Sequence, residues 1–169
     1  MLAPSAGGAS RHVRELLRRC GSVHRLNQLH AHLVVNGSSV VDAVASQILA
    51  SYCAIPAGLC YARHLFDRIP DPERFMYNNL IRAYCNSHCP REALRLHRGM
   101  IRRGILPNEF TLPFVLKACT TTQAWDHVLV THGVVVKLGF VRQGHWGILS
   151  GSFMRWWTEM WFRGTSMIN

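Results

Sequence analysis

The stretch that decides the fold runs from Arg74 to Asn108 and reads RFMYNNLIRAYCNSHCPREALRLHRGMIRRGILPN. Its first half carries apolar residues at helical spacing, at Leu80, Ile81 and Tyr84. Pro90 then begins a second periodic segment, because proline is favoured in the first turn of a helix. These 35 residues therefore predict two helices joined by a short turn.

The second helix continues the apolar face with Leu94, Leu96 and Met100. Gly104 is expected to end this helix, and Pro107 prevents its continuation. A single pair of helices cannot bury such a face by itself, so neighbouring pairs must stack on it. The sequence therefore predicts an array of helix pairs rather than one isolated hairpin.

Two other stretches, residues 16–37 and 115–139, share one pattern and support an internal repeat. Their last residues, Gly37 and Gly139, are 102 positions apart, which equals three units of about 34 residues. Self-similarity at this period is typical of solenoids. The other matched positions are Cys20 with Cys119 and His30 with His132.

The composition indicates a folded, basic protein. Of the 169 residues, 49% are hydrophobic, and 19 Lys and Arg outnumber 9 Asp and Glu to give a net charge of +10. Such an excess favours polyanionic partners, which include nucleic acids, anionic membrane surfaces and acidic proteins. No uncharged apolar run approaches the roughly 20 residues that span a bilayer, so we expect no membrane insertion. The six cysteines contain no CxxC pair, which favours a reducing compartment.

The stretch from Arg74 to Asn108 resembles a pentatricopeptide repeat nearly from end to end. The flanking units resemble the longer and shorter variants that alternate with this repeat in the plant PLS subclass. The resemblance implies an all-α fold, a right-handed α-solenoid of about four units. The expected units are residues 9–41 (long), 42–73 (short), 74–108 (standard) and 109–143 (long), after a leader at 1–8 and before an irregular tail at 144–169.

The resemblance also implies single-stranded RNA as the partner, because helical repeats of this kind recognise one base each. In the standard unit the two base-recognising positions are Asn78 and Asn108, a pair that in the family favours cytosine over uracil. In the short unit they are Ser46 and Glu73, and the acidic ending departs from the family pattern. An alternative interpretation is that Asn78 only decorates its helix and that Asn108 only forms a turn.

The long units contribute less to base recognition. The first long unit places Arg14 next to the fifth position, and the second places Pro113 at it; Pro113 has no side-chain donor for a base. We expect basic side chains to attract the phosphates, so that affinity falls as salt rises, although a solvated helix face explains each of them equally well. The candidates are Arg82, Arg91, Arg95, Arg98, Arg102 and Arg103.

We expect no catalysis, cofactor or metal. The H-x-E and P-C-x-x-C signature of zinc deaminases is missing from the sequence, and Cys85, His88 and Cys89 do not have the spacing of a zinc site. Any chemistry on the RNA, such as editing or processing, would come from a separate enzyme. Two other hypotheses remain open: a solenoid scaffold for protein partners, and a truncated product without independent activity.

The two ends carry further expectations. The first fourteen residues contain Arg, Ser and Ala but no acid, as in transit peptides, which predicts a mitochondrial or chloroplast location. Residues 141–165 lose the helical periodicity and are rich in Trp. Since Trp and Met have one codon each, residues 156–162 constrain their nucleotides, and another frame can encode VDRNVV, which resembles a repeat. We therefore predict that residues 141–165 are a frame-shifted translation.

Overall fold

A computed structural model describes residues 6–36, 38–124, 126–127, 131 and 133. All regular structure in these residues is helical, which confirms the predicted all-α fold. The expected tail at 144–169, the frame-shift at 141–165 and the start of the leader lie outside the described residues. The helices are α1 (Ala6–Arg19), α2 (Val23–Asn36), α3 (Ser38–Ala54), the 3-10 turn η1 (Pro56–Gly58), α4 (Leu59–Asp67), α5 (Arg74–Cys85), α6 (Pro90–Arg102) and α7 (Leu112–Thr122).

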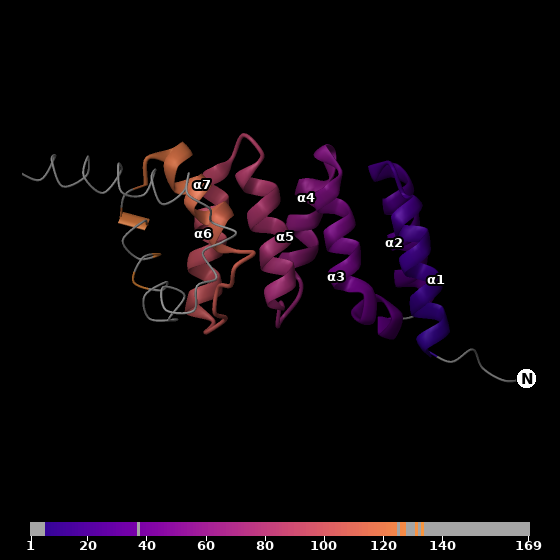
Figure 1. Cartoon of the computed structure of the whole chain (residues 1–169). Coiled ribbons are helices and arrows are strands. Elements are labelled where there is room, and N and C mark those ends of the chain that lie inside the picture. Colours follow the sequence, from indigo (N-terminus) through magenta and orange to yellow (C-terminus); the bar gives the residue numbers. More distant parts are fainter. Residues whose placement is uncertain (1–5, 37, 125, 128–130, 132, 134–169) are drawn as a thin grey trace, which may run out of the picture.

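The helices form two layers that extend along one direction, from α1 at one end to α7 at the other (Figure 1). In one layer α1 contacts α3, α3 contacts α5, and α5 contacts α7. The helices of the other layer pack on this row: α2 contacts α3, α4 contacts α3 and α5, and α6 contacts α5 and α7. Stacked helix pairs of this kind make an α-solenoid, as the repeat pattern predicts. The right-handed sense of the superhelix stays a prediction.

The helices follow one another in consecutive pairs along the chain. The pairs are α1 with α2, α3 with α4, and α5 with α6, and α7 is the first helix of the fourth unit. In the standard unit α5 begins at Arg74 and α6 begins at Pro90. Elsewhere α1 begins at Ala6 and α3 at Ser38, a few residues before the expected start of their units. The unit boundaries themselves stay predictions.

The core lies between the two layers. The apolar stripe of the standard unit is buried, with Leu80, Ile81 and Met100 fully inaccessible to solvent. Ile48 of α3 and Val115 of α7 are also fully buried, so the core continues through consecutive units. Burying an aliphatic side chain of this size contributes about 1.5–3 kcal/mol relative to exposure. This continuity explains why one pair of helices alone would not suffice.

The turn after α6 returns the chain to the first layer. Gly104 takes the left-handed conformation, with φ +73°, which favours glycine. The Ile105 N–H donates to the Met100 carbonyl and the Gly104 N–H donates to the Ile101 carbonyl, the two bonds of a Schellman motif. Gly104 therefore ends the helix as the sequence predicts. The chain continues through the buried Pro107 and brings Asn108 back beside α5.

Candidate nucleic-acid interface

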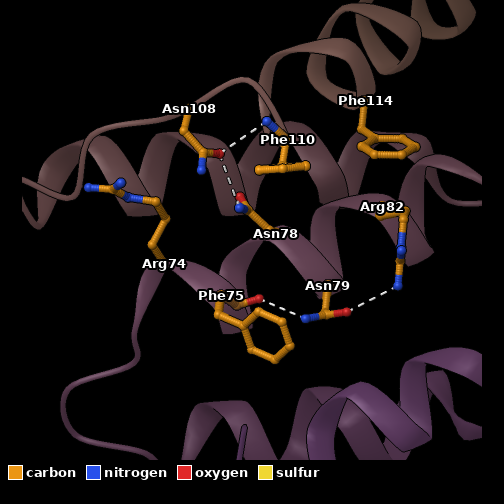
Figure 2. A pocket seen from close by; sticks show the side chains of 8 residues that line it. All are labelled: Arg74, Phe75, Asn78, Asn79, Arg82, Asn108, Phe110 and Phe114. Atoms are coloured by element: carbon orange, nitrogen blue, oxygen red, sulfur yellow. Dashed lines mark hydrogen bonds between the residues drawn. The ribbon is translucent and has the colours of Figure 1, made fainter. Parts of the chain in front are cut away.

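A pocket of about 480 Å³ opens where α5 faces the start of α7 (Figure 2). Its walls come from the first helix of the standard unit, from the end of that unit and from the beginning of the next one. The pocket therefore belongs to the contact between two consecutive units. The lining residues are Arg74, Phe75, Asn78, Asn79, Arg82, Asn108, Phe110 and Phe114.

The two asparagines predicted from the repeat pattern meet in this pocket. Asn78 lies on α5, and its Nδ2 donates a hydrogen bond of 3.2 Å to Oδ1 of Asn108, thirty residues later in the chain. Both side chains are partly buried. The structure thus brings together the pair that the sequence selects, while their role in base recognition stays a prediction.

Asn108 also holds the turn that leads into α7. Its Oδ1 accepts hydrogen bonds from the backbone N–H groups of Phe110 and Thr111, each at 3.2 Å (Figure 2 draws the first). In return the Thr111 hydroxyl accepts a bond of 3.1 Å from the Asn108 N–H. These reciprocal bonds form a capping box ahead of α7. The turn interpretation of Asn108 therefore holds alongside its place in the pocket.

Two exposed aromatic rings flank the asparagines, and the sequence reasoning missed both. Phe75 is 51% exposed and Phe110 is 64% exposed, although a phenylalanine is usually buried. Figure 2 shows one ring on each side of Asn78 in the view. The sequence did contain a signal for them, because a phenylalanine recurs at the second position of two consecutive units, 35 residues apart. Exposed rings in a pocket offer flat apolar surfaces for stacking.

Positive charge reaches the pocket from α5. Arg74 and Arg82 line it, and both are exposed. Arg82 Nη2 donates to Asn79 Oδ1 at 3.1 Å, and Asn79 Nδ2 donates to the Phe75 carbonyl at 2.8 Å, which holds the guanidinium along the helix. Lys117 occupies the equivalent position on α7, 35 residues after Arg82. Lys117 Nζ donates to Asn86 Oδ1 of the preceding unit at 2.8 Å. The first helices α5 and α7 therefore both carry a cation at this position, and the one on α5 lines the pocket.

The other predicted cations do not line this pocket, because they lie on or directly after α6 in the second layer. Arg95 pairs with Glu92, and Arg98 Nε donates to His127 Nδ1 at 3.1 Å. Arg103 donates to the Pro70 carbonyl at 3.0 Å. Phosphate contact by these α6 residues stays a prediction. The full set is Arg91, Arg95, Arg98, Arg102 and Arg103.

The other positions predicted for base recognition lie outside the pocket. Ser46 is half-buried on α3 and Glu73 is exposed immediately before α5, and no hydrogen bond joins these two described side chains. Arg14 is exposed on α1, and Pro113 lies in the first turn of α7. None of these four residues lines the pocket. Their roles stay predictions.

Three of the thiols, those of Cys53, Cys85 and Cys119, are poor nucleophiles. Burial raises the pKa of the Cys53 and Cys119 thiols to about 12, and it also raises the pKa of Cys85. A protonated thiol neither attacks an electrophile nor binds a metal readily. Among the described residues, no three His, Cys, Asp or Glu side chains are grouped so as to hold a metal ion. Within the same residues, no helix is long and apolar enough to cross a membrane.

Comparison with known proteins supports the repeat assignment. The sequence pattern of the PPR repeat family matches residues 72–121, which contain α5, α6 and most of α7. A pentatricopeptide repeat-containing protein of Arabidopsis thaliana is 36% identical over 128 residues, which cover 75% of this chain and 23% of the relative. A second, whose name describes it as chloroplastic, is 34% identical over 127 residues, or 73% of this chain and 17% of the relative. The chain thus spans less than a quarter of either relative, and it belongs to the pentatricopeptide repeat family.

Proposed function

We propose that this chain binds single-stranded RNA and that the pocket between α5 and α7 receives one base. The observation that carries the proposal is the convergence of two amide side chains with two exposed aromatic rings in one pocket. Amides supply donors and acceptors for a base edge, and aromatic rings stack on the base face. The pocket therefore combines the two interactions by which proteins hold unpaired bases.

The charge of the chain supports the same partner. Arg74 and Arg82 lie in the pocket wall, and Lys117 continues the row on the next first helix. The net charge of +10 adds a long-range attraction for polyanions. A strand that crosses the first-helix layer would pass these cations in turn, so its phosphates would be held while one base enters the pocket.

The expected base preference is a pyrimidine, with cytosine bound more tightly than uracil, as the family pattern implies for Asn78 and Asn108. One base contact is worth about 1–3 kcal/mol. A single well-formed pocket therefore gives a modest preference on top of binding that depends mainly on charge. We expect the described units to bind RNA broadly rather than to select one transcript.

The wider role that we propose is organelle RNA maturation, through recognition of editing sites, splicing or processing, with the chemistry supplied by another protein. The alternation of long, short and standard units, as in the plant PLS subclass, supports this role. The transit-peptide composition of the first fourteen residues supports mitochondria or chloroplasts as the location. The chloroplastic relative points in the same direction.

The test is a titration of the full chain with short fluorescent oligonucleotides, followed by anisotropy. Single-stranded RNA of C, U or A and matched DNA are compared at about 50 and about 200 mM salt. We expect RNA to bind, more weakly at the higher salt, with C-rich RNA ahead of A-rich RNA. A chain that is helical by circular dichroism but binds no RNA at low salt would contradict the proposal.

A further inference from the structure

Thr111 is the fully buried residue behind the two asparagines. It immediately precedes α7, none of its surface is exposed, and it does not belong to the pair predicted from the repeat pattern. Its hydroxyl oxygen lies 2.6 Å from Asn78 Oδ1 and 2.9 Å from Asn108 Oδ1. One buried hydroxyl therefore contacts both amides.

The orientation of the Asn108 amide follows from its backbone partners. The N–H groups of Phe110 and Thr111 both point at this side chain from 3.2 Å, and an N–H group can only donate. The atom that they meet must therefore be the oxygen, because an amide NH₂ cannot accept. The Nδ2 of Asn108 consequently lies on the other side of the amide, and no acceptor among the described residues bonds to it.

The orientation of the Asn78 amide depends on Thr111. The Thr111 oxygen already accepts the Asn108 N–H, and its single proton is available to donate to Asn78 Oδ1, the nearer of the two oxygens. The Asn78 Nδ2 then donates one of its two protons to Asn108 Oδ1. Both amide oxygens are held toward the protein, and N–H groups of both residues remain without partners.

We propose that Thr111 is a positioning residue that sets the base preference of this pocket by fixing the Asn78 amide with its nitrogen toward Asn108. This inference rests on the proposed RNA binding and adds a third residue to the asparagine pair. With the amides held in this way, the pocket offers mainly donors. Cytosine has two adjacent acceptors, N3 and O2, on its pairing edge, whereas uracil has a donor, N3–H, between two acceptors. A pocket of donors therefore favours cytosine.

Removal of the hydroxyl releases the Asn78 amide. Without the bond from Thr111, the Asn78 oxygen loses its partner, and the amide can rotate to offer an acceptor to the N3–H of uracil. The preference for cytosine should then decline, while attraction of the phosphates by Arg74 and Arg82 continues. A loss of base preference without a loss of salt-dependent binding is the signature of a positioning role.

The test compares Thr111→Val, which keeps the shape and removes the hydroxyl, with Thr111→Ser, which keeps the hydroxyl. Thr122→Val is the matched control, because it removes a hydroxyl of α7 that bonds the Ala118 carbonyl and does not line the pocket. Affinities of the full chain for C-rich and U-rich RNA are measured for each protein. We expect Thr111→Val to lower the ratio of the two affinities about fivefold or more. Thr111→Ser and Thr122→Val should keep it.

A spectroscopic measurement follows the amide without RNA. In the NMR spectrum of the unaltered chain, the Asn78 Nδ2 proton that bonds to Asn108 Oδ1 should exchange slowly with solvent, and Thr111→Val should shift its signal and speed that exchange. Rapid exchange of this proton with solvent in the unaltered chain would overturn the positioning role even if Thr111→Val does not fold. A C-to-U ratio that a folded Thr111→Val retains, or that Thr111→Ser also loses, would overturn it too. Absence of RNA binding by the unaltered, folded chain overturns the proposed function itself.

Discussion

At the scale of single residues, Asn108 has two roles that fall on different atoms of one amide. Its Oδ1 accepts the backbone N–H groups of Phe110 and Thr111 in the turn that leads into α7, and its Nδ2 has no acceptor among the described residues. Aspartate keeps an oxygen for the cap but has no N–H, whereas alanine has neither. The two substitutions therefore separate the contribution to stability from the contribution to base recognition.

We predict that Asn108→Ala lowers the free energy of unfolding by about 1 kcal/mol, the usual value of a helix cap. Asn108→Asp should retain most of that stability, since a carboxylate also suits the positive end of a helix dipole. Both variants should bind C-rich RNA more weakly than the unaltered chain. Urea denaturation and anisotropy measure the two effects. Equal destabilisation by Asp and Ala would show that Oδ1 does not act as the cap.

The exposed rings of Phe75 and Phe110 give a second prediction at this scale. Replacing either ring by alanine should lower the affinity for single-stranded RNA by about 1–3 kcal/mol, the usual value of a base stacked on an aromatic side chain. Stability should change little, because each ring is more than half exposed. Leu106→Ala is the control, since Leu106 is 53% exposed and does not line the pocket. Unchanged affinity in both phenylalanine variants would exclude stacking.

At the scale of elements, a buried histidine pair joins α6 to the segment after α7. His97 Nδ1 lies 3.0 Å from His127 Nε2, and Arg98 Nε donates to His127 Nδ1 at 3.1 Å. Because Nδ1 of His127 accepts, its Nε2 carries the proton and donates to His97. Both rings are therefore neutral. Burial, followed by the electrostatic interaction with the neighbouring His127, lowers the pKa of His97 to about 4, and burial with the Arg98 charge lowers that of His127.

This pair predicts acid sensitivity of the contact. The unfolded chain protonates His97 near its ordinary pKa of 6.5, whereas the folded chain resists protonation down to about 4. Stability is therefore highest above pH 6.5 and declines as the pH falls toward 4, by at most about 3 kcal/mol for this residue. In thermal unfolding experiments across this pH range, the melting temperature of His97→Leu should fall less steeply with pH than that of the unaltered chain. His64→Leu is the matched control, because it removes an exposed histidine that lies outside the pair.

At the scale of the whole molecule, the two layers divide the positive charge. Arg82 lines the pocket from α5 and Lys117 lies on the next first helix, α7, whereas Arg91 and Arg102 lie on α6 in the second layer. If RNA crosses the first-helix layer, only the first group meets its phosphates. From the sequence alone all these cations are equally plausible phosphate contacts, because composition does not show which of them lie on the same face of the molecule.

We predict that Arg82→Gln and Lys117→Gln each reduce the slope of log affinity against log salt by about one unit. Arg91→Gln is the matched control, since it removes the same charge from an exposed position on α6. Its slope should equal that of the unaltered chain. Anisotropy titrations of one RNA over a series of salt concentrations measure the slope. A larger effect of Arg91→Gln would place the RNA on the second layer.

The sequence by itself predicts the helices and their order. Residues three or four apart share a helical face, so the stripe of Leu80 and Ile81 is visible in the sequence, and Pro90 and Gly104 mark helix ends through backbone restrictions of their own. The repeat period predicts that the pairs stack. The choice of Asn78 and Asn108 came from the resemblance to a family rather than from any local pattern.

The pocket forms only through tertiary structure, because its residues come from different units. Asn78 and Thr111 are 33 residues apart, and only the packing of α5 beside α7 brings the hydroxyl within 2.6 Å of the amide. The same packing leaves Phe75 and Phe110 exposed, although their apolar character alone predicts burial. Helix formation depends on hydrogen bonds and contacts within one turn of the chain, so the sequence determines it directly. The orientation of an amide depends on partners from another unit, which only the folded array supplies.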